Sequence, residues 1–203
     1  MMIKAVVFDV GGVLLKMAEQ EYRQGIARRM GLAVLPAEYE ENVPLLQRGE
    51  LAEAAFWSRL AGRPVAPDAF DDLWLAHFTE DGAMLALAEE LRGMGLRTAI
   101  LSNTQASHVR LMRGMGFLEG FAPVAFSCEI GRRKPEAVAF QWVLERLGLR
   151  VPEVAYVDDM PEYVEAAARI GIRGVVHRGN VAQTRQALLA MAGSPAVPRG
   201  DPP

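Results

Sequence analysis

The chain has 203 residues, of which 51% are hydrophobic and 23% are charged, which is the balance of an ordinary globular protein. This length allows one domain, or one domain with a small insertion. The formal net charge of −3 argues against a surface that binds DNA or RNA. No apolar run is long enough to span a membrane or to form the core of a signal peptide, so we expect a cytoplasmic protein without membrane contacts.

A single cysteine, Cys128, rules out an internal disulfide and fits a reducing compartment. A free cysteine is either a reactive thiol or a small apolar residue of the core. No histidine or other base lies close to Cys128 in the sequence, and we therefore expect a buried, unreactive thiol.

The first predicted element is a strand over residues 3–8, an apolar run typical of strands that are buried on both faces. Asp9 follows the strand, and Gly11 and Gly12 then allow the backbone to turn sharply and to approach a ligand closely. Open parallel sheets bind their ligands at the carboxyl ends of their strands. Asp9 is therefore a candidate functional residue, although a loop that merely begins with an acid would look the same.

Residues 16–80 show helical periodicity and no convincing strand. The apolar residues at helical spacing are Tyr22, Ile26 and Met30, then Leu45, Leu46, Leu51, Phe56, Trp57 and Leu60, and finally Phe70, Leu73, Trp74 and Phe78. We expect Asp68 to cap the last of these helices. Because the gap to the next strand is longer than a crossover of one helix, we predict that residues 16–80 form an inserted helical subdomain.

From residue 81 onward, predicted helices and strands alternate. The expected helices cover residues 83–94, 105–115, 135–147, 161–171 and 181–192, and the expected strands cover 97–101, 124–126, 154–157 and 172–176. This alternation predicts an α/β fold of three layers, in which helices cover both faces of a parallel sheet. Residues 1–15 and 81–192 would form this core. The proline-rich segment 193–203 is expected to be a disordered tail.

Polar residues follow four of the predicted strands. They are Asp9, the segment Ser102–Thr104, the basic segment Arg132–Lys134, and the pair Asp158 and Asp159. The carboxyl ends of parallel strands meet at one edge of the sheet, so we expect these groups to converge. Three converging carboxylates need a cation, or one of them must be protonated, because like charges raise each other's pKa. If a cation is bound, the hard oxygen ligands favour Mg²⁺.

The same edge also offers groups that suit a phosphate. These are a serine hydroxyl, free amides at a helix start and a lysine. Together with a cation and a carboxylate nucleophile, they indicate phosphoryl transfer through an aspartyl-phosphate. Each part alone has a simpler interpretation, because Ser102–Thr104 could be a helix cap and Arg132–Lys134 a solvated charge run. The histidines His77, His108 and His177 lie far apart in the sequence, and we interpret them as surface or cap residues.

These motifs, in this order and spacing, resemble the haloacid dehalogenase superfamily. Phe8–Leu14 resembles its first motif, Leu101–Thr104 the second, Arg133–Pro135 the third and Val157–Asp159 the fourth. The helical segment 16–80 is similar to the cap of this family. The resemblance covers the chain apart from the tail, and it implies a Rossmann-like, five-stranded parallel sheet of order 5-4-1-2-3.

The resemblance also implies a role for each site residue. Asp9 would be the nucleophile and a ligand of Mg²⁺, and the main-chain carbonyl of Gly11 would be a second ligand. Asp159 would bind the metal directly, whereas Asp158 would act through water or a hydrogen bond. The remaining residues implied to bind substrate are Ser102 and the amide of Asn103, which would hold the phosphate, and Lys134, which would bridge the phosphate and the nucleophile.

The chain departs from the family pattern at two positions. Phosphatases of the family usually carry a second Asp, the general acid and base, where this chain has Gly11, and many members with the acid pair carry Asn where it has Tyr163. General acid–base catalysis is typically worth roughly 10²–10⁴-fold in rate. If another group supplies the proton, His77 and the acids near Glu50 in the cap segment are the first candidates.

The resemblance favours a Mg²⁺-dependent phosphatase or phosphotransferase for a small phosphorylated metabolite. A 2-haloacid dehalogenase is an alternative, since a halide leaving group needs no acid, but that reaction does not need the metal site suggested by Asp158 and Asp159. The third hypothesis is a non-catalytic protein that binds a phosphorylated ligand. A homodimer is an option that the sequence leaves open.

Overall fold

A five-stranded parallel sheet forms the centre of the computed structural model, which describes residues 2–193. Its strands are β1 (Ala5–Phe8), β4 (Arg97–Ser102), β5 (Phe121–Phe126), β6 (Val154–Asp158) and β7 (Arg173–Val176). They lie in the order β5-β4-β1-β6-β7, and every neighbouring pair is parallel. Counted along the chain, this is the predicted order of 5-4-1-2-3 read from the other edge. The predicted fold class is therefore confirmed.

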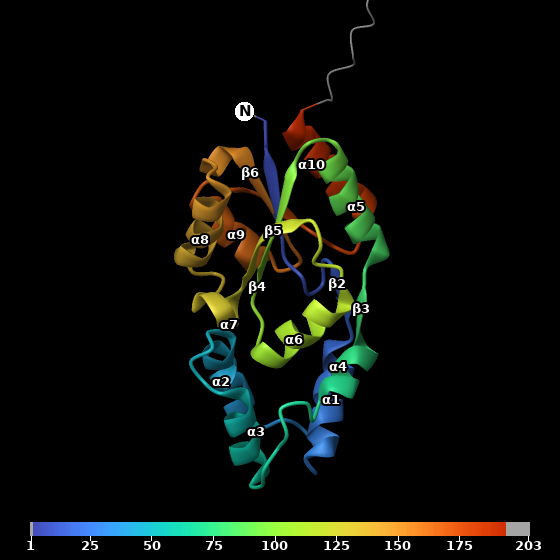
Figure 1. Cartoon of the computed structure of the whole chain (residues 1–203), viewed down its shortest axis with the longest axis vertical. Helices are drawn as coiled ribbons and strands as arrows, with labels where there is room; N and C mark the ends of the chain where they lie inside the picture. The colour runs from blue at the N-terminus through green and yellow to red at the C-terminus, as the bar shows by residue number, and fades with distance from the viewer. Residues whose placement is uncertain (1, 194–203) are drawn as a thin grey trace, which may run out of the picture.

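Helices cover both faces of this sheet (Figure 1). On one face lie α5 (Gly82–Gly93), α6 (Ala106–Met115) and α10 (Val181–Ala192), and on the other lie α8 (Ala137–Leu147) and α9 (Pro161–Arg169). Successive residues of a strand point to opposite faces, so Val6 and Phe8 pack in one cluster while Ala5 and Val7 pack in the other. A strand with two buried faces reads as a continuous apolar run, which is why β1 could be predicted from sequence.

The segment between β1 and α5 contains four helices that gather at one end of the molecule (Figure 1). They are α1 (Glu19–Arg29), α2 (Ala37–Gln47), α3 (Glu53–Ala61) and α4 (Asp71–His77). We call these helices the cap. Aromatic contacts hold them together, for example the stacking of Tyr39 on Trp57 at 5.4 Å and the edge contact of Trp57 with Phe70 at 5.1 Å between ring centroids.

Two short strands join the cap to the sheet domain, and the sequence analysis missed them. Strands β2 (Leu15–Met17) and β3 (Phe78–Glu80) pair antiparallel, with Met17 opposite Phe78. The expectation that residues 16–80 contain no strand is therefore wrong at both ends of that segment. A strand of three residues is too short to show a period of two, and it is its tertiary pairing that defines it.

Several other boundaries differ from the prediction. Asp68 does not cap α4, which begins at Asp71 after the N-cap residue Phe70 and has no side-chain cap bond. Helix α8 begins at Ala137 rather than at Pro135, and the short elements α7 (Ser127–Ile130) and the 3₁₀ helix Val151–Glu153 were not anticipated. Apart from Gly193, the predicted tail lies outside the described residues.

Two isolated predictions about single residues can also be compared with the structure. His177 is buried, with its Nδ1 atom 2.8 Å from Thr184 Oγ1, and the N-cap residue of the neighbouring helix α10 is Asn180, so the interpretation of His177 as a surface or cap residue is wrong. Cys128 is half-buried, and burial together with the nearby Glu129 raises its thiol pKa to about 11, which disfavours the reactive thiolate. Within residues 2–193 we find no helix that is long and apolar enough to cross a membrane. The cytoplasmic location stays a prediction.

Candidate active site

The loop after β1 places Asp9 at the carboxyl edge of the sheet. The amide of Asp9 still follows the sheet, since it donates to the carbonyl of Val157 at 2.9 Å. The chain then turns tightly at Gly12, which has a φ of +71°. A Cβ atom at this position would overlap the carboxylate of Asp159. Gly12 is therefore required twice, by the left-handed backbone and by the close approach of Asp159.

Lys134 connects two of the acids. Its Nζ atom lies 2.8 Å from Asp9 Oδ1 and 2.7 Å from Asp158 Oδ2, and the lysine side chain is 1% exposed. Burial lowers the pKa of Lys134, but the charges of Asp9 and Asp158 outweigh it, so the net shift is upward and the lysine stays charged. Burial raises the pKa of Asp9 to about 7, with Lys134 lowering it and Asp158 raising it.

Both oxygens of the Asp158 carboxylate are engaged by the protein. Oδ2 accepts from Lys134 and from the hydroxyl of Tyr156, and Oδ1 accepts from the amide of Met160 at 2.8 Å. Asp159 is only partly buried and lines the cleft described below, and burial, followed by the charge of Asp158, raises its pKa. Oxygen atoms of Asp9, Asp158 and Asp159 lie within 4.8 Å of one another, close enough for a shared cation.

The end of β4 supports Lys134 from a second direction. The Asn103 side chain donates from Nδ2 to the carbonyl of Lys134 at 2.9 Å and accepts from its amide at 2.8 Å. Ser127 holds Thr104 in the same way, through contacts of 2.8 Å and 3.2 Å to its amide and carbonyl. These two side-chain clamps fix the backbone around the buried Ser102. The sequence contained the residues of these clamps but no signal for their pairing.

A cleft of about 270 Å³ opens over these residues. Of the predicted site residues, Asp9, Gly11, Ser102, Asn103, Lys134 and Asp159 line it, whereas Asp158 does not. The cap side of the cleft is mostly apolar and aromatic, with Leu15, Met17, Tyr39, Val43, Trp74 and Phe78 in its wall. Tyr163 also lines the cleft, and its ring lies 4.9 Å from the Nζ atom of Lys134. Arg133, from the predicted basic segment, does not line the cleft; its Nε atom donates to Gln47 Oε1 of the cap at 3.1 Å.

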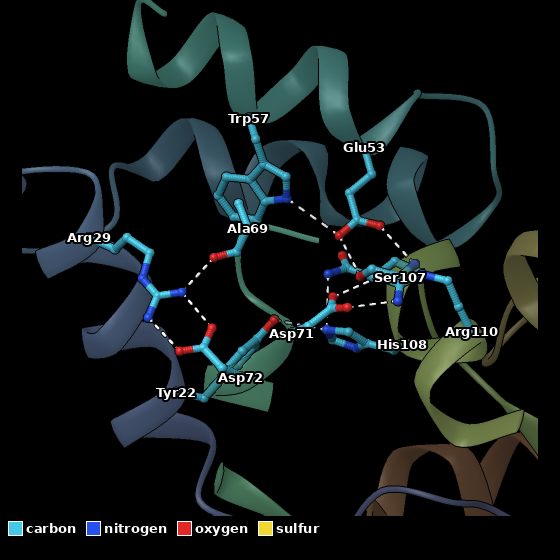
Figure 2. Close-up of polar contacts among 11 residues, drawn as sticks. Tyr22, Arg29, Glu53, Trp57, Ala69, Asp71, Asp72, Ser107, His108 and Arg110 are labelled. Carbon is cyan, nitrogen blue, oxygen red and sulfur yellow. Dashed lines mark hydrogen bonds and ion pairs between the residues drawn. The ribbon is translucent and has the colours of Figure 1, made fainter. Parts of the chain in front are cut away.

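The candidates for a replacement acid differ from those expected. His77 and Glu50 do not line the cleft, but His108, Glu19 and Glu40 do. The Nε2 atom of His108 lies 3.0 Å from the hydroxyl of Tyr22, and Figure 2 shows the two side chains facing each other. Burial lowers the pKa of this histidine to about 3. A neutral imidazole of this kind has no spare proton for a leaving group at neutral pH, although it can take part in hydrogen bonds.

Two carboxylates of the cap dock it onto α6 beside His108 (Figure 2). Glu53 accepts from the amide of Ser107 at 3.0 Å and from its hydroxyl at 2.7 Å. Asp71 binds the guanidinium of Arg110 through two bonds of 2.7 Å. These contacts hold the aromatic wall of the cap over the carboxyl edge of the sheet.

A family model for haloacid dehalogenase-like hydrolases matches residues 3–171 of this chain. The fold is a Rossmann-like parallel sheet with an acidic edge, and the family match shows that the chain belongs to the haloacid dehalogenase-like hydrolase family. The predicted family and the prediction of an enzyme are confirmed.

Two curated relatives are phosphatases by name. The sesquiterpene phosphatase astK of Aspergillus oryzae is 25% identical over 177 residues, which are 85% of this chain and 88% of the relative. Phosphoglycolate phosphatase of Rhodospirillum rubrum is 28% identical, with 86% of this chain and 79% of the relative covered.

Solved structures show the same fold. A HAD-like family hydrolase from Porphyromonas gingivalis has a TM-score of 0.76 at 25% identity, and the match covers 92% of this chain and 98% of the hydrolase chain. A HAD family enzyme from Bacteroides thetaiotaomicron, solved in complex with magnesium and inorganic phosphate, has a TM-score of 0.73 at 22% identity, with 87% of this chain and 94% of that chain covered.

Proposed function

We propose that this protein is a Mg²⁺-dependent phosphatase or phosphotransferase that acts on a small phosphorylated metabolite through an aspartyl-phosphate on Asp9. The observation that carries the proposal is the buried contact of Lys134 with Asp9 at the floor of the cleft, beside Asp159. A lysine in this position can orient a carboxylate nucleophile and bind a phosphoryl oxygen. The names of the two phosphatases described above support phosphate-ester hydrolysis rather than dehalogenation.

The donor set suits Mg²⁺, which prefers hard oxygen ligands. Asp9, Asp159 and the backbone carbonyl of Gly11 would hold the ion. Asp158 would support the site indirectly, because both of its oxygens already accept hydrogen bonds from the protein. When bound, Mg²⁺ supplies positive charge that offsets the charge of the transferring phosphoryl group. The magnesium and phosphate bound by the Bacteroides thetaiotaomicron enzyme support the same choice.

The protein's own residues would carry the reaction in two steps. A carboxylate oxygen of Asp9 attacks phosphorus, the bond from phosphorus to the leaving oxygen breaks, and that oxygen takes a proton from water. A second water then attacks the aspartyl-phosphate, which releases inorganic phosphate and restores the carboxylate. Ser102, the amide of Asn103 and Lys134 would hold the phosphoryl oxygens throughout. Burial of Asp9 and Lys134 strengthens their interaction because it excludes water.

Gly11 limits the leaving groups that this site can expel. Without an acid at this position, the leaving oxygen departs largely unprotonated, which favours aryl and acyl phosphates over simple alkyl phosphates. The packing around Gly11 also leaves no room for a side chain. A Cβ atom on Gly11 would lie 2.6 Å from the Sδ atom of Met17, so the methionine occupies the space beside the nucleophile.

Asp9→Asn tests the proposal, because the amide has nearly the size of the acid but is a far poorer nucleophile. We expect phosphate release from phenyl phosphate to be abolished in the variant and to require Mg²⁺ in the natural protein. A thermal melt serves as the control for folding. Turnover that persists in Asp9→Asn, or that is unchanged in excess EDTA, would contradict the proposed mechanism.

A further inference from the structure

The cap side of the cleft contains a cluster of three charged residues. Arg23 of α1 forms ion pairs with Glu40 of α2 and, at 3.8 Å, with Glu19 one helical turn earlier. Its guanidinium also lies over the ring of Tyr39, at 4.9 Å from the ring centroid. All four residues line the cleft. We call Arg23, Glu19 and Glu40 the cap triad.

No cation in the lining of the cleft is left without a carboxylate partner. Within the described residues that line it, the cations are Arg23 and Lys134. Lys134 is bound by Asp9 and Asp158, and Arg23 is bound by the two acids of the cap triad. The cap triad therefore carries a net charge of −1 beside a wall that, apart from Gln47, is apolar and aromatic. A leaving group with a carboxylate would meet repulsion there and no free partner.

We propose that the cap triad makes the site selective for phosphate esters of uncharged, largely apolar leaving groups, and that Glu40 sets this selectivity by pairing Arg23. This inference rests on the proposed phosphatase function and adds the class of substrate. The apolar wall of Leu15, Met17, Val43 and Phe78 favours burial of such a group. The triad disfavours an anionic group of the same size.

Two matched probes isolate the charge of the leaving group. 3-Carboxyphenyl phosphate and 3-carbamoylphenyl phosphate have nearly the same shape, but only the first carries a carboxylate on the ring of its leaving group. The quantity measured is the ratio of kcat/KM for the carboxy probe to that for the carbamoyl probe. The difference in intrinsic reactivity of the two probes cancels when this ratio is compared between variants.

Two variants should move the ratio in opposite directions. Glu40→Gln removes the negative charge of one of the two acids that pair with Arg23. We expect the ratio to rise about 3- to 10-fold, which is the size of a charge interaction in a partly exposed cleft. Arg23→Met leaves both acids uncompensated, and we expect the ratio to fall by a similar factor. The changes should be found mainly in KM, because the triad contacts the leaving group and not the phosphoryl group. Glu41→Gln, an exposed neighbour outside the cleft lining, is the matched control and should leave the ratio unchanged.

The outcomes separate the two proposals. If both probes are hydrolysed in an Asp9-dependent manner but the ratio is the same in Glu40→Gln, Arg23→Met and the natural protein, the phosphatase function stands and the selectivity of the cap triad is overturned. An equal shift in Glu41→Gln would overturn it too, because it would show a general effect of surface charge. If the natural protein hydrolyses neither probe, the proposed function fails and the inference falls with it.

Discussion

The two walls of the cleft are built in different ways. On the core side, the charges of Asp9, Lys134 and Asp158 are buried, and each has a partner within hydrogen-bond distance. On the cap side, Arg23 and Glu40 keep 32% and 57% of their side-chain surface exposed, and the wall around them is apolar and aromatic. Figure 1 shows that the cap helices and the sheet, which supply these two walls, lie in different parts of the molecule.

This difference assigns different tasks to the two walls. Removing one partner of a buried ion pair leaves an uncompensated charge, whereas an exposed pair contributes little to stability. The core wall is therefore sensitive to any change of charge and suits the chemical step. The cap wall can change its charge at little cost in stability, and this freedom suits a surface that selects among leaving groups.

The largest expected effect is that of Lys134→Met. The substitution leaves Asp9 and Asp158 buried without their cation, which should destabilise the protein by about 3–5 kcal/mol and abolish phosphate release. Urea unfolding monitored by circular dichroism, together with an assay on phenyl phosphate, measures both effects. A loss of stability below about 1 kcal/mol would mean that the two acids are solvated, and the contrast between the walls would disappear.

Gly11→Asp tests whether the missing acid limits the rate. Gly11 does not adopt a positive φ, so the backbone accepts a side chain, but Met17 must move. We expect the double variant Gly11→Asp/Met17→Ala to hydrolyse alkyl phosphates faster, by up to the roughly 10²–10⁴-fold of general acid catalysis, and to gain less on aryl phosphates. Met17→Ala alone is the control. Equal rates of the natural protein on both substrate classes, with no gain in the double variant, would show that another group already supplies the proton.

The pH dependence of stability should report the environment of Asp9 in the metal-free protein. Its pKa is raised from the ordinary 3.8 to about 7, so the folded state binds this proton more tightly than the unfolded state does. Stability should therefore fall as pH rises between these two values, by up to about 4 kcal/mol, since one pKa unit corresponds to about 1.4 kcal/mol.

Asp9→Asn mimics the protonated acid and should lack this part of the pH dependence. The measurement is the difference in Tm between the natural protein and the variant, in EDTA, from pH 4 to pH 8. A difference that does not change with pH would contradict the raised pKa. Adding Mg²⁺ at pH 8 should stabilise the natural protein more than the variant, because a ligand that binds only the folded state raises its stability.

The smallest effect is expected for Arg110→Met at the contact between the cap and α6. The guanidinium of Arg110 is bound by two bonds to Asp71, but the arginine side chain is 51% exposed. An exposed pair contributes about 0.2–1 kcal/mol, so unfolding in urea should change by no more than this amount. The same change to methionine at Lys134 thus gives a direct comparison of an exposed and a buried ion pair, and similar losses at the two positions would contradict the premise that burial separates the two walls.

The sequence alone determined the α/β class and the residues at the strand ends, and its resemblance to the family implied the strand order. Buried parallel strands leave continuous apolar runs such as Ala5–Phe8. The carboxyl ends of these strands must share one edge of the sheet, so Asp9, Ser102, Lys134 and Asp159 could be expected near one another. Each of these signals is local in the sequence, or follows from the topology of a parallel sheet. The same signals underlie the resemblance to the family that the comparison confirmed.

The tertiary structure decided how these residues are partnered. The clamp of Asn103 on Lys134 joins residues that are far apart in the sequence, and the hydrogen bonds of Asp158 to Lys134 and Tyr156 turn a predicted metal neighbour into a support for the lysine. Strand β2 exists only because β3 pairs with it. The sequence places Glu19 one helical turn before Arg23, but only the tertiary structure brings Glu40 of α2 to the same guanidinium, because long-range contacts leave no periodic pattern in either helix.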